Sequence, residues 1–153
     1  MTTFFAKTAA AALVVAAFAA PAMAQNASGT IQLKGNVGLS CTIAVQDLSQ
    51  SLSLKTGESN KTVGSVTETC NSGTGYKITL ASSNGGKLKS GNFTIDYQVN
   101  YDGQGGSLNS QMVVDRANAQ FNKKSDLKVT VQASDQYIAG DYADTVTVTI
   151  AAK

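Results

Sequence analysis

The sequence predicts an all-β protein folded as a β-sandwich. Apolar and polar residues alternate over long stretches, which is the pattern of strands with one buried face and one exposed face. Gly-rich turns separate these stretches, and about seven or eight strand candidates follow one another along the chain. No helical period persists, and 153 residues are the length of a single domain.

The composition argues against several classes of function. The chain carries 12 basic and 10 acidic residues, and its net charge of +2 is too small for the basic face of a nucleic-acid-binding protein. It contains no His, and so lacks the commonest general base and the commonest metal ligand. Only 14% of the residues are charged, which suits a β-rich protein outside the cytoplasm.

Residues 1–24 have the layout of a secretory signal peptide. An apolar run covers Ala9–Ala20, and Ala22-Met23-Ala24 places small residues before Gln25. The alternative is a membrane anchor, but the apolar run is shorter than the roughly 20 residues that span a bilayer. We therefore expect cleavage after Ala24 and a mature chain, residues 25–153, without a transmembrane segment.

The first strand region is longer than one strand. Apolar residues occupy the odd positions from Ala27 to Val45, and polar residues occupy most of the even ones. Strands usually have about 3 to 10 residues. The alternation therefore predicts two segments, with Gly35 and Gly38 as the break between them.

The remaining strand candidates are separated by turns. Asn84-Gly85 is typical of a hairpin turn. Residues 110–121 fit either a short helix or an irregular edge strand. The strand candidates are 48–54, 63–70, 76–80, 93–101, 127–133 and 145–150.

Cys41 and Cys70 are the two cysteines of the chain. Export and an even cysteine count favour a structural disulfide between them. A redox-active pair would usually have the C-x-x-C spacing, and a metal site would need more ligands.

The acidic residues give no catalytic pattern. Nothing in their spacing distinguishes a glycosidase pair from solvated loop acids, and the Gly-rich loop 102–106 fits a turn better than a calcium site. We therefore predict no catalytic residue, no metal site, no cofactor and no enzymatic activity. The loop acids are Asp96, Asp102, Asp135, Asp141 and Asp144.

Four segments carry a resemblance to a known family. The most specific is the terminal motif Gly140–Ile150, and the spacing of Cys41 and Cys70 with the following Gly-Tyr strand adds to it. The segments are 37–43, 70–80, 95–102 and 140–150. They are spread along most of the length of the mature chain, which resembles the spore coat protein U domain family, including the major pilins of archaic chaperone–usher pili.

The resemblance implies an incomplete immunoglobulin-like sandwich with an apolar groove in place of one strand. A periplasmic chaperone fills this groove first, and the N-terminal extension of the next identical subunit then replaces it, with an outer-membrane usher assembling the fibre. On this basis residues 25–36 are the donor-strand extension and residues 37–153 are the pilin domain. The implied product is a surface pilus, exported through the periplasm, that supports adhesion and biofilm formation.

A donor strand presents apolar side chains at every second position, because only one of its faces enters the groove. The predicted donor residues are Ala27, Gly29, Ile31, Leu33 and Gly35. The predicted groove residues on the final strand are Val146, Val148 and Ile150. The resemblance also favours a subunit of the fibre shaft, because the mature chain is too short for a second, receptor-binding domain.

A second interpretation remains open. The chain is then a self-contained secreted β-sandwich, such as a coat protein or a carbohydrate-binding protein. In that case residues 25–36 fold back into the sheet of their own chain.

Overall fold

The computed structural model describes residues 26–153, so the expected signal peptide lies outside the described residues. The described residues form nine strands and no helix, and so contain no helix that would cross a membrane. The predicted all-β class is confirmed. The strands are β1 (Cys41–Asp47), β2 (Glu58–Cys70), β3 (Tyr76–Ser82), β4 (Lys87–Ser90), β5 (Phe93–Tyr101), β6 (Gln104–Gly106), β7 (Met112–Arg116), β8 (Gln120–Val131) and β9 (Val146–Ala152).

The chain divides at Gly35, and residues 36–153 form a compact unit that holds all nine strands. Residues 26–40 form no strand. The long N-terminal alternation therefore contributes one strand to the compact unit, and this strand begins at Cys41.

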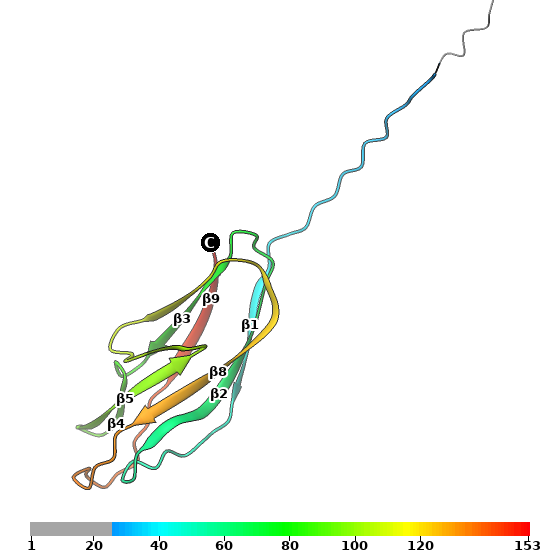
Figure 1. The fold of residues 1–153 in the computed structure, drawn as a ribbon. Helices are drawn as coiled ribbons and strands as arrows, with labels where there is room; N and C mark the ends of the chain where they lie inside the picture. Colours follow the sequence, from blue (N-terminus) through cyan, green and yellow to red (C-terminus); the bar gives the residue numbers. More distant parts are fainter. Residues whose placement is uncertain (1–25) are drawn as a thin grey trace, which may run out of the picture. The chain divides into compact units, whose positions relative to one another are not determined.

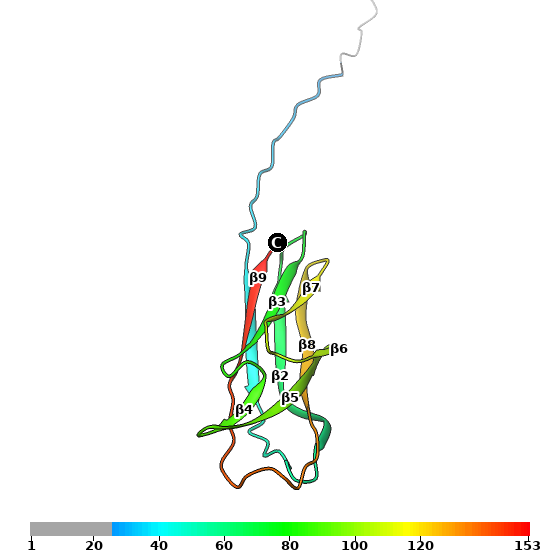
Figure 2. The same cartoon turned by 90° about the vertical axis from the view of Figure 1, so that its left-hand side faces the viewer.

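The compact unit is a sandwich of two antiparallel sheets (Figure 1). The larger sheet has the order β1-β2-β8-β5-β4, with β6 paired to β5. The smaller sheet has the order β7-β3-β9, and Figure 2 shows it face on, in front of the larger sheet. Both sheets contribute side chains to one hydrophobic core, which is the expected consequence of one apolar face on each sheet.

The alternating apolar residues of β3 and β5 fill this core. Ile78 and Leu80 of β3 are fully buried, and Ile95, Tyr97 and Val99 of β5 are nearly so. Phe93, the first residue of β5, occupies the same alternate positions as Ile95, Tyr97 and Val99 but is half exposed. The predicted strand 93–101 coincides with β5.

Two local predictions are wrong. Residues 48–54 form no strand; Leu52 and Leu54 instead pack on the core from a loop. Asn84-Gly85 does not close a hairpin, because β3 belongs to the smaller sheet and β4 pairs with β5 in the larger one. This turn carries the chain from one sheet to the other.

A two-residue hairpin occurs elsewhere, between β5 and β6. Tyr101 lies opposite Gln104, and Asp102 and Gly103 between them have φ values of 51° and 85°. Two positive φ values in succession are those of a type I′ turn, which matches the twist of the flanking strands. Residues 110–121, for which the sequence left two options, contain the edge strand β7 and no helix.

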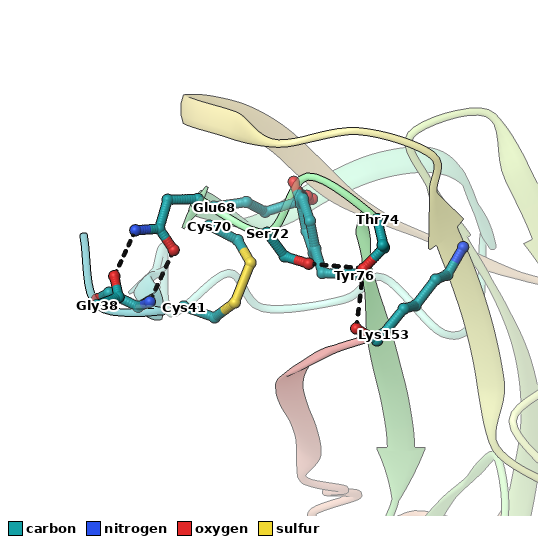
Figure 3. The surroundings of a disulfide bond; sticks show 10 residues. Gly38, Cys41, Glu68, Cys70, Ser72, Thr74, Tyr76 and Lys153 are labelled. Atoms are coloured by element: carbon teal, nitrogen blue, oxygen red, sulfur yellow. Dashed lines mark hydrogen bonds between the residues drawn. A yellow bond between two sulfur atoms is a disulfide. The ribbon is translucent and has the colours of Figure 1, made fainter. Parts of the chain in front are cut away.

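The predicted disulfide is present. Cys41 and Cys70 lie opposite each other in the β1–β2 pair and are bonded across 29 residues of chain (Figure 3). Beside it, the Asn71 side chain accepts from the Ser40 amide at 2.7 Å and donates to the Gly38 carbonyl at 2.7 Å. The disulfide and these two hydrogen bonds attach the start of β1 to the end of β2.

The last residue of the chain is held close to this connection. The Lys153 amide donates to the Gly75 carbonyl at 3.1 Å. Thr74 Oγ1 donates to the Lys153 carbonyl at 3.0 Å (Figure 3). Gly75 has φ 86°, and a β-carbon there would overlap the carbonyl oxygen of Arg116. Only glycine fits this position.

Candidate functional site

The strand registers define the two ends of the sandwich. Cys41 lies opposite Cys70 in the β1–β2 pair, and Tyr76 lies opposite Ala152 in the β3–β9 pair. The short connection 71–75 joins β2 to β3, so all four residues lie at one end, which we call the disulfide end. β1 therefore runs away from the disulfide end, and β9 runs toward it.

β1 and β9 are edge strands of different sheets and lie along the same side of the sandwich (Figure 2). Within residues 26–153, β1 pairs only with β2, and β9 pairs only with β3. Each strand therefore has one edge of backbone N–H and C=O groups without a strand partner in the described part of the chain. Such an edge is a template for an added strand.

A groove of about 680 Å³ opens between these two edges. Its floor is apolar and comes from the facing surfaces of both sheets and from the loop 50–54. The apolar lining residues are Val45, Leu52, Leu54, Val63, Val66, Leu88, Leu127, Val129, Val146 and Val148. The shape and lining suit an extended segment with apolar side chains on one face.

The structure places the predicted groove residues in two ways. Val146 and Val148 line the groove from β9, and both are only partly buried against the core. Ile150, two residues closer to the disulfide end, packs on the core and is not part of the lining. The open part of the groove therefore lies toward the end of the sandwich opposite the disulfide.

Most of the lining was not predicted from the sequence. Val63 and Val66 lie in β2, Leu127 and Val129 lie in β8, and Leu52 lies in a loop. Their apolar character is visible in the sequence, but an apolar residue facing a groove and one facing a closed core give the same pattern. The period-two signal identifies the inward face and leaves open whether that face is covered.

The charged residues of the groove lining are all acidic. They are Asp47, Asp141 and Asp144, and we call this group the acidic end of the groove. Asp47 is the last residue of β1, and Asp141 and Asp144 come just before β9. All three therefore lie at the end opposite the disulfide. In residues 26–153 none of them forms an ion pair.

Asp144 is held firmly by neutral donors. Its carboxylate accepts hydrogen bonds from Ser82 Oγ at 2.5 Å, from Tyr97 Oη at 2.6 Å and from the Asn84 amide at 3.1 Å. Burial, and then the hydrogen bond to Asp144, raise the pKa of Tyr97. The contacts join the turn 83–86 to the segment before β9, and so fix the wall of the groove.

The predicted donor residues lie in the segment 26–35, which forms no strand. Ile31 and Leu33 are 89% and 91% exposed. Ala27, Gly29 and Gly35 are exposed as well. Their role as a donor strand remains a prediction.

A second polar cluster lies inside the sandwich at the disulfide end. Glu68 is fully buried and accepts hydrogen bonds from Tyr76 and Tyr101, each at 2.6 Å, and from Ser125 at 3.3 Å. Arg116 donates from Nε at 2.9 Å and from Nη2 at 2.7 Å. We call these five residues the Glu68 cluster; every buried polar atom in it has a partner.

The Glu68 cluster keeps its carboxylate ionised. Burial alone would raise the pKa, but the hydrogen bonds from Arg116, Tyr101 and Tyr76 outweigh it and lower the pKa of Glu68 to about 2. The hydrogen bond with Glu68 raises the pKa of Arg116 in turn. Each buried polar atom of the cluster has a partner, so the cluster suits a structural role.

The Glu68 cluster predicts a loss of stability in acid. The pKa of Glu68 is about 2 in the folded chain, whereas that of a free glutamate side chain is 4.5. A lowered pKa stabilises the fold above pH 4.5, and this contribution, about 3 kcal/mol, is lost as the pH falls from 4.5 toward 2. Urea unfolding at a series of pH values measures the effect. A Glu68→Gln variant is the control and should lack this part of the slope.

No family model matches the chain, and no curated protein matches it. Among solved structures, the chain is similar to the E. coli Hda pilus minor tip subunit, HdaB, with 15% sequence identity. The match covers 71% of this chain and 79% of HdaB, with a TM-score of 0.39.

Proposed function

We propose that this chain is a structural subunit of a surface fibre, in which residues 27–35 of each copy fill the groove of the next. One observation carries the proposal: an open apolar groove and an exposed segment with the alternation to fill it occur in the same chain. The groove lies between the free edges of β1 and β9. The exposed segment presents Ile31 and Leu33.

The energetics favour such an exchange. Burying Ile31 and Leu33 in the groove stabilises the contact by roughly 1.5–3 kcal/mol for each side chain. An added strand also gives hydrogen-bond partners to the free edge of β9. Because each copy offers one segment and one groove, the contact is head to tail and continues from copy to copy.

The route of assembly follows from the same proposal. An open groove and an uncovered strand edge need protection before assembly, which a periplasmic chaperone would give, and an outer-membrane usher would order the subunits into a pilus. The fibre would then act at the cell surface in adhesion and biofilm formation. The role proposed for the chain is mechanical and not catalytic.

A charge placed on the donor face tests the proposal. We expect Leu33→Asp to weaken the contact between copies at least about 100-fold, because the groove loses an apolar side chain and must bury a carboxylate. Gln32→Asp is the matched control: it adds the same charge on the opposite face and should still assemble. Sedimentation or size-exclusion chromatography of the refolded mature chain measures the difference.

The groove itself is tested with the donor-deficient variant. A labelled peptide of residues 25–36 should bind Leu33→Asp protein and raise its unfolding temperature, whereas a peptide carrying the same substitution should not. Failure of both peptides to bind, together with a monomeric wild-type chain, would contradict the proposal. That result would favour the self-contained secreted β-sandwich, with residues 25–36 folded into their own sheet.

A further inference from the structure

We infer that the incoming segment, antiparallel to β9, takes the register that places Leu33 opposite Val146 and Ile31 opposite Val148, and that Lys34 meets the acidic end of the groove. This inference rests on the proposed function. It adds the register of the strand and the recognition of one cation. Three features carry it: the position of the groove's open volume, the order of side-chain sizes in the segment, and the distribution of charge.

The open volume fixes where the large side chains go. The lining includes Val146 and Val148 of β9 and Val45 of β1, all in the half of the sandwich away from the disulfide. At the disulfide end Ile150, Cys41 and Ile43 pack on the core and do not line the groove. Large side chains of an added strand therefore fit opposite Val146 and Val148, and small ones fit nearer the disulfide.

The segment has a matching order of sizes. Its apolar positions carry Ala27 and Gly29 first, and the large Ile31 and Leu33 next. In an antiparallel pair, opposite residues point to the same face. With Leu33 opposite Val146, Ile31 falls opposite Val148, and the two small residues fall opposite Ile150 and Ala152.

Charge selects the direction. Lys34 is the one charged residue in the segment 26–36, and the charged lining residues are the three carboxylates of the acidic end. In the antiparallel direction Lys34 follows Leu33 out of the groove at this end. In the reverse direction, with Ile31 opposite Val146, Lys34 would lie beside Thr149, away from the carboxylates and closer to Lys153. Complementary charges therefore favour the antiparallel direction.

The register makes defined neighbours on the outer face. Thr30 lies opposite Thr149, and Gln32 lies opposite Thr147. Both threonines are exposed in the structure. Opposite residues of an antiparallel pair have Cα atoms roughly 4.5–5.5 Å apart, which is within the range of a disulfide. Cysteines at these positions report the register without changing the groove.

The experiment mixes two single-cysteine variants of the mature chain and allows mild oxidation, so that each cross-link joins two copies. Thr30→Cys mixed with Thr149→Cys should give a cross-linked dimer on a non-reducing gel. A reversed strand would instead bring residue 30 beside residue 145. The Thr30→Cys and Thr145→Cys mixture should therefore give at least about 10-fold less dimer. Gln32→Cys should cross-link to Thr147→Cys in preference to Thr149→Cys. A cross-link between Gln32→Cys and Thr149→Cys would report a slip of the register by two residues.

The outcomes separate the inference from the proposed function. If the copies assemble but the reversed or slipped pair dominates, the register is wrong and the donor-strand function stands. If no combination assembles or cross-links, the proposed function fails, and the inference fails with it.

The contact of Lys34 is tested by exchanging charges. Lys34→Glu should weaken the contact between copies about five-fold at low salt, and the double change Asp47→Lys/Asp141→Lys in the same chain should restore it. Lys34→Gln, which only removes the charge, is the control with an intermediate effect. An unchanged affinity of the Lys34→Glu chain at low salt would overturn the contact with the acidic end.

Discussion

Replacing Glu68 by Gln is expected to lower the free energy of unfolding by about 3–5 kcal/mol. The substitution keeps the size of the side chain but removes its charge. The Arg116 guanidinium, whose side chain is only 11% exposed, then loses its fully buried partner and keeps only Asp102, whose side chain is 30% exposed. Tyr76 and Tyr101 also lose a charged acceptor for their hydroxyl groups. Urea unfolding of the two proteins at neutral pH and equal concentration measures the difference.

The control for this substitution is Asp96→Asn, which removes a carboxylate from an ion pair at the surface. Asp96 pairs with Lys87, and its side chain is 81% exposed. The expected change is within about 1 kcal/mol. If the Glu68→Gln protein were as stable as this control, the buried ion pair would not contribute to the fold as the geometry indicates. A Glu68→Leu/Arg116→Leu double variant separates the cost of the unpaired charge from the value of the pair.

Replacing both Cys41 and Cys70 by Ser is expected to lower the free energy of unfolding by roughly 3–4 kcal/mol, on the chain-entropy model for a loop of 29 residues. The effect should be largest in β1, because this edge strand pairs only with β2 in the described part of the chain. Denaturation gives the total change. Hydrogen exchange, which should become faster in β1 before it does in β5, gives its position.

Reductant provides the control for the cysteine substitutions. It should lower the stability of the wild-type chain to that of the double variant and should leave the double variant unchanged. Equal stability of the oxidised and reduced wild-type chains would show that the two hydrogen bonds of the Asn71 side chain hold β1 without the disulfide.

The sequence predicts the strands best where a strand alternates and is covered on one face by the other sheet. β5 agrees with its predicted range because Ile95, Tyr97, Val99 and Tyr101 all meet the facing sheet. The loop of Leu52 and Leu54 carries the same alternation and forms no strand. There the apolar side chains pack on the core, and within residues 26–153 the backbone of residues 50–54 pairs with no strand.

The Glu68 cluster was missed although one signal was present. In β2, Val66, Glu68 and Cys70 share one parity, and all three are buried. Because every second residue of a strand faces the same side, the alternation alone places the Glu68 carboxylate on the inward face. Its partners could not be found in the same way, because Tyr76, Tyr101, Arg116 and Ser125 come from four other strands that only the fold brings together.

The uncovered edge of β9 has a further consequence. Between Asp144 and Lys153 it carries no charge and no proline, two of the devices by which edge strands prevent unwanted pairing. If the chain is a fibre subunit as proposed, two copies with open grooves would be free to join β9 to β9 symmetrically, which would close both grooves and end growth. The yield of long filaments would then depend on how briefly each new copy stays unshielded.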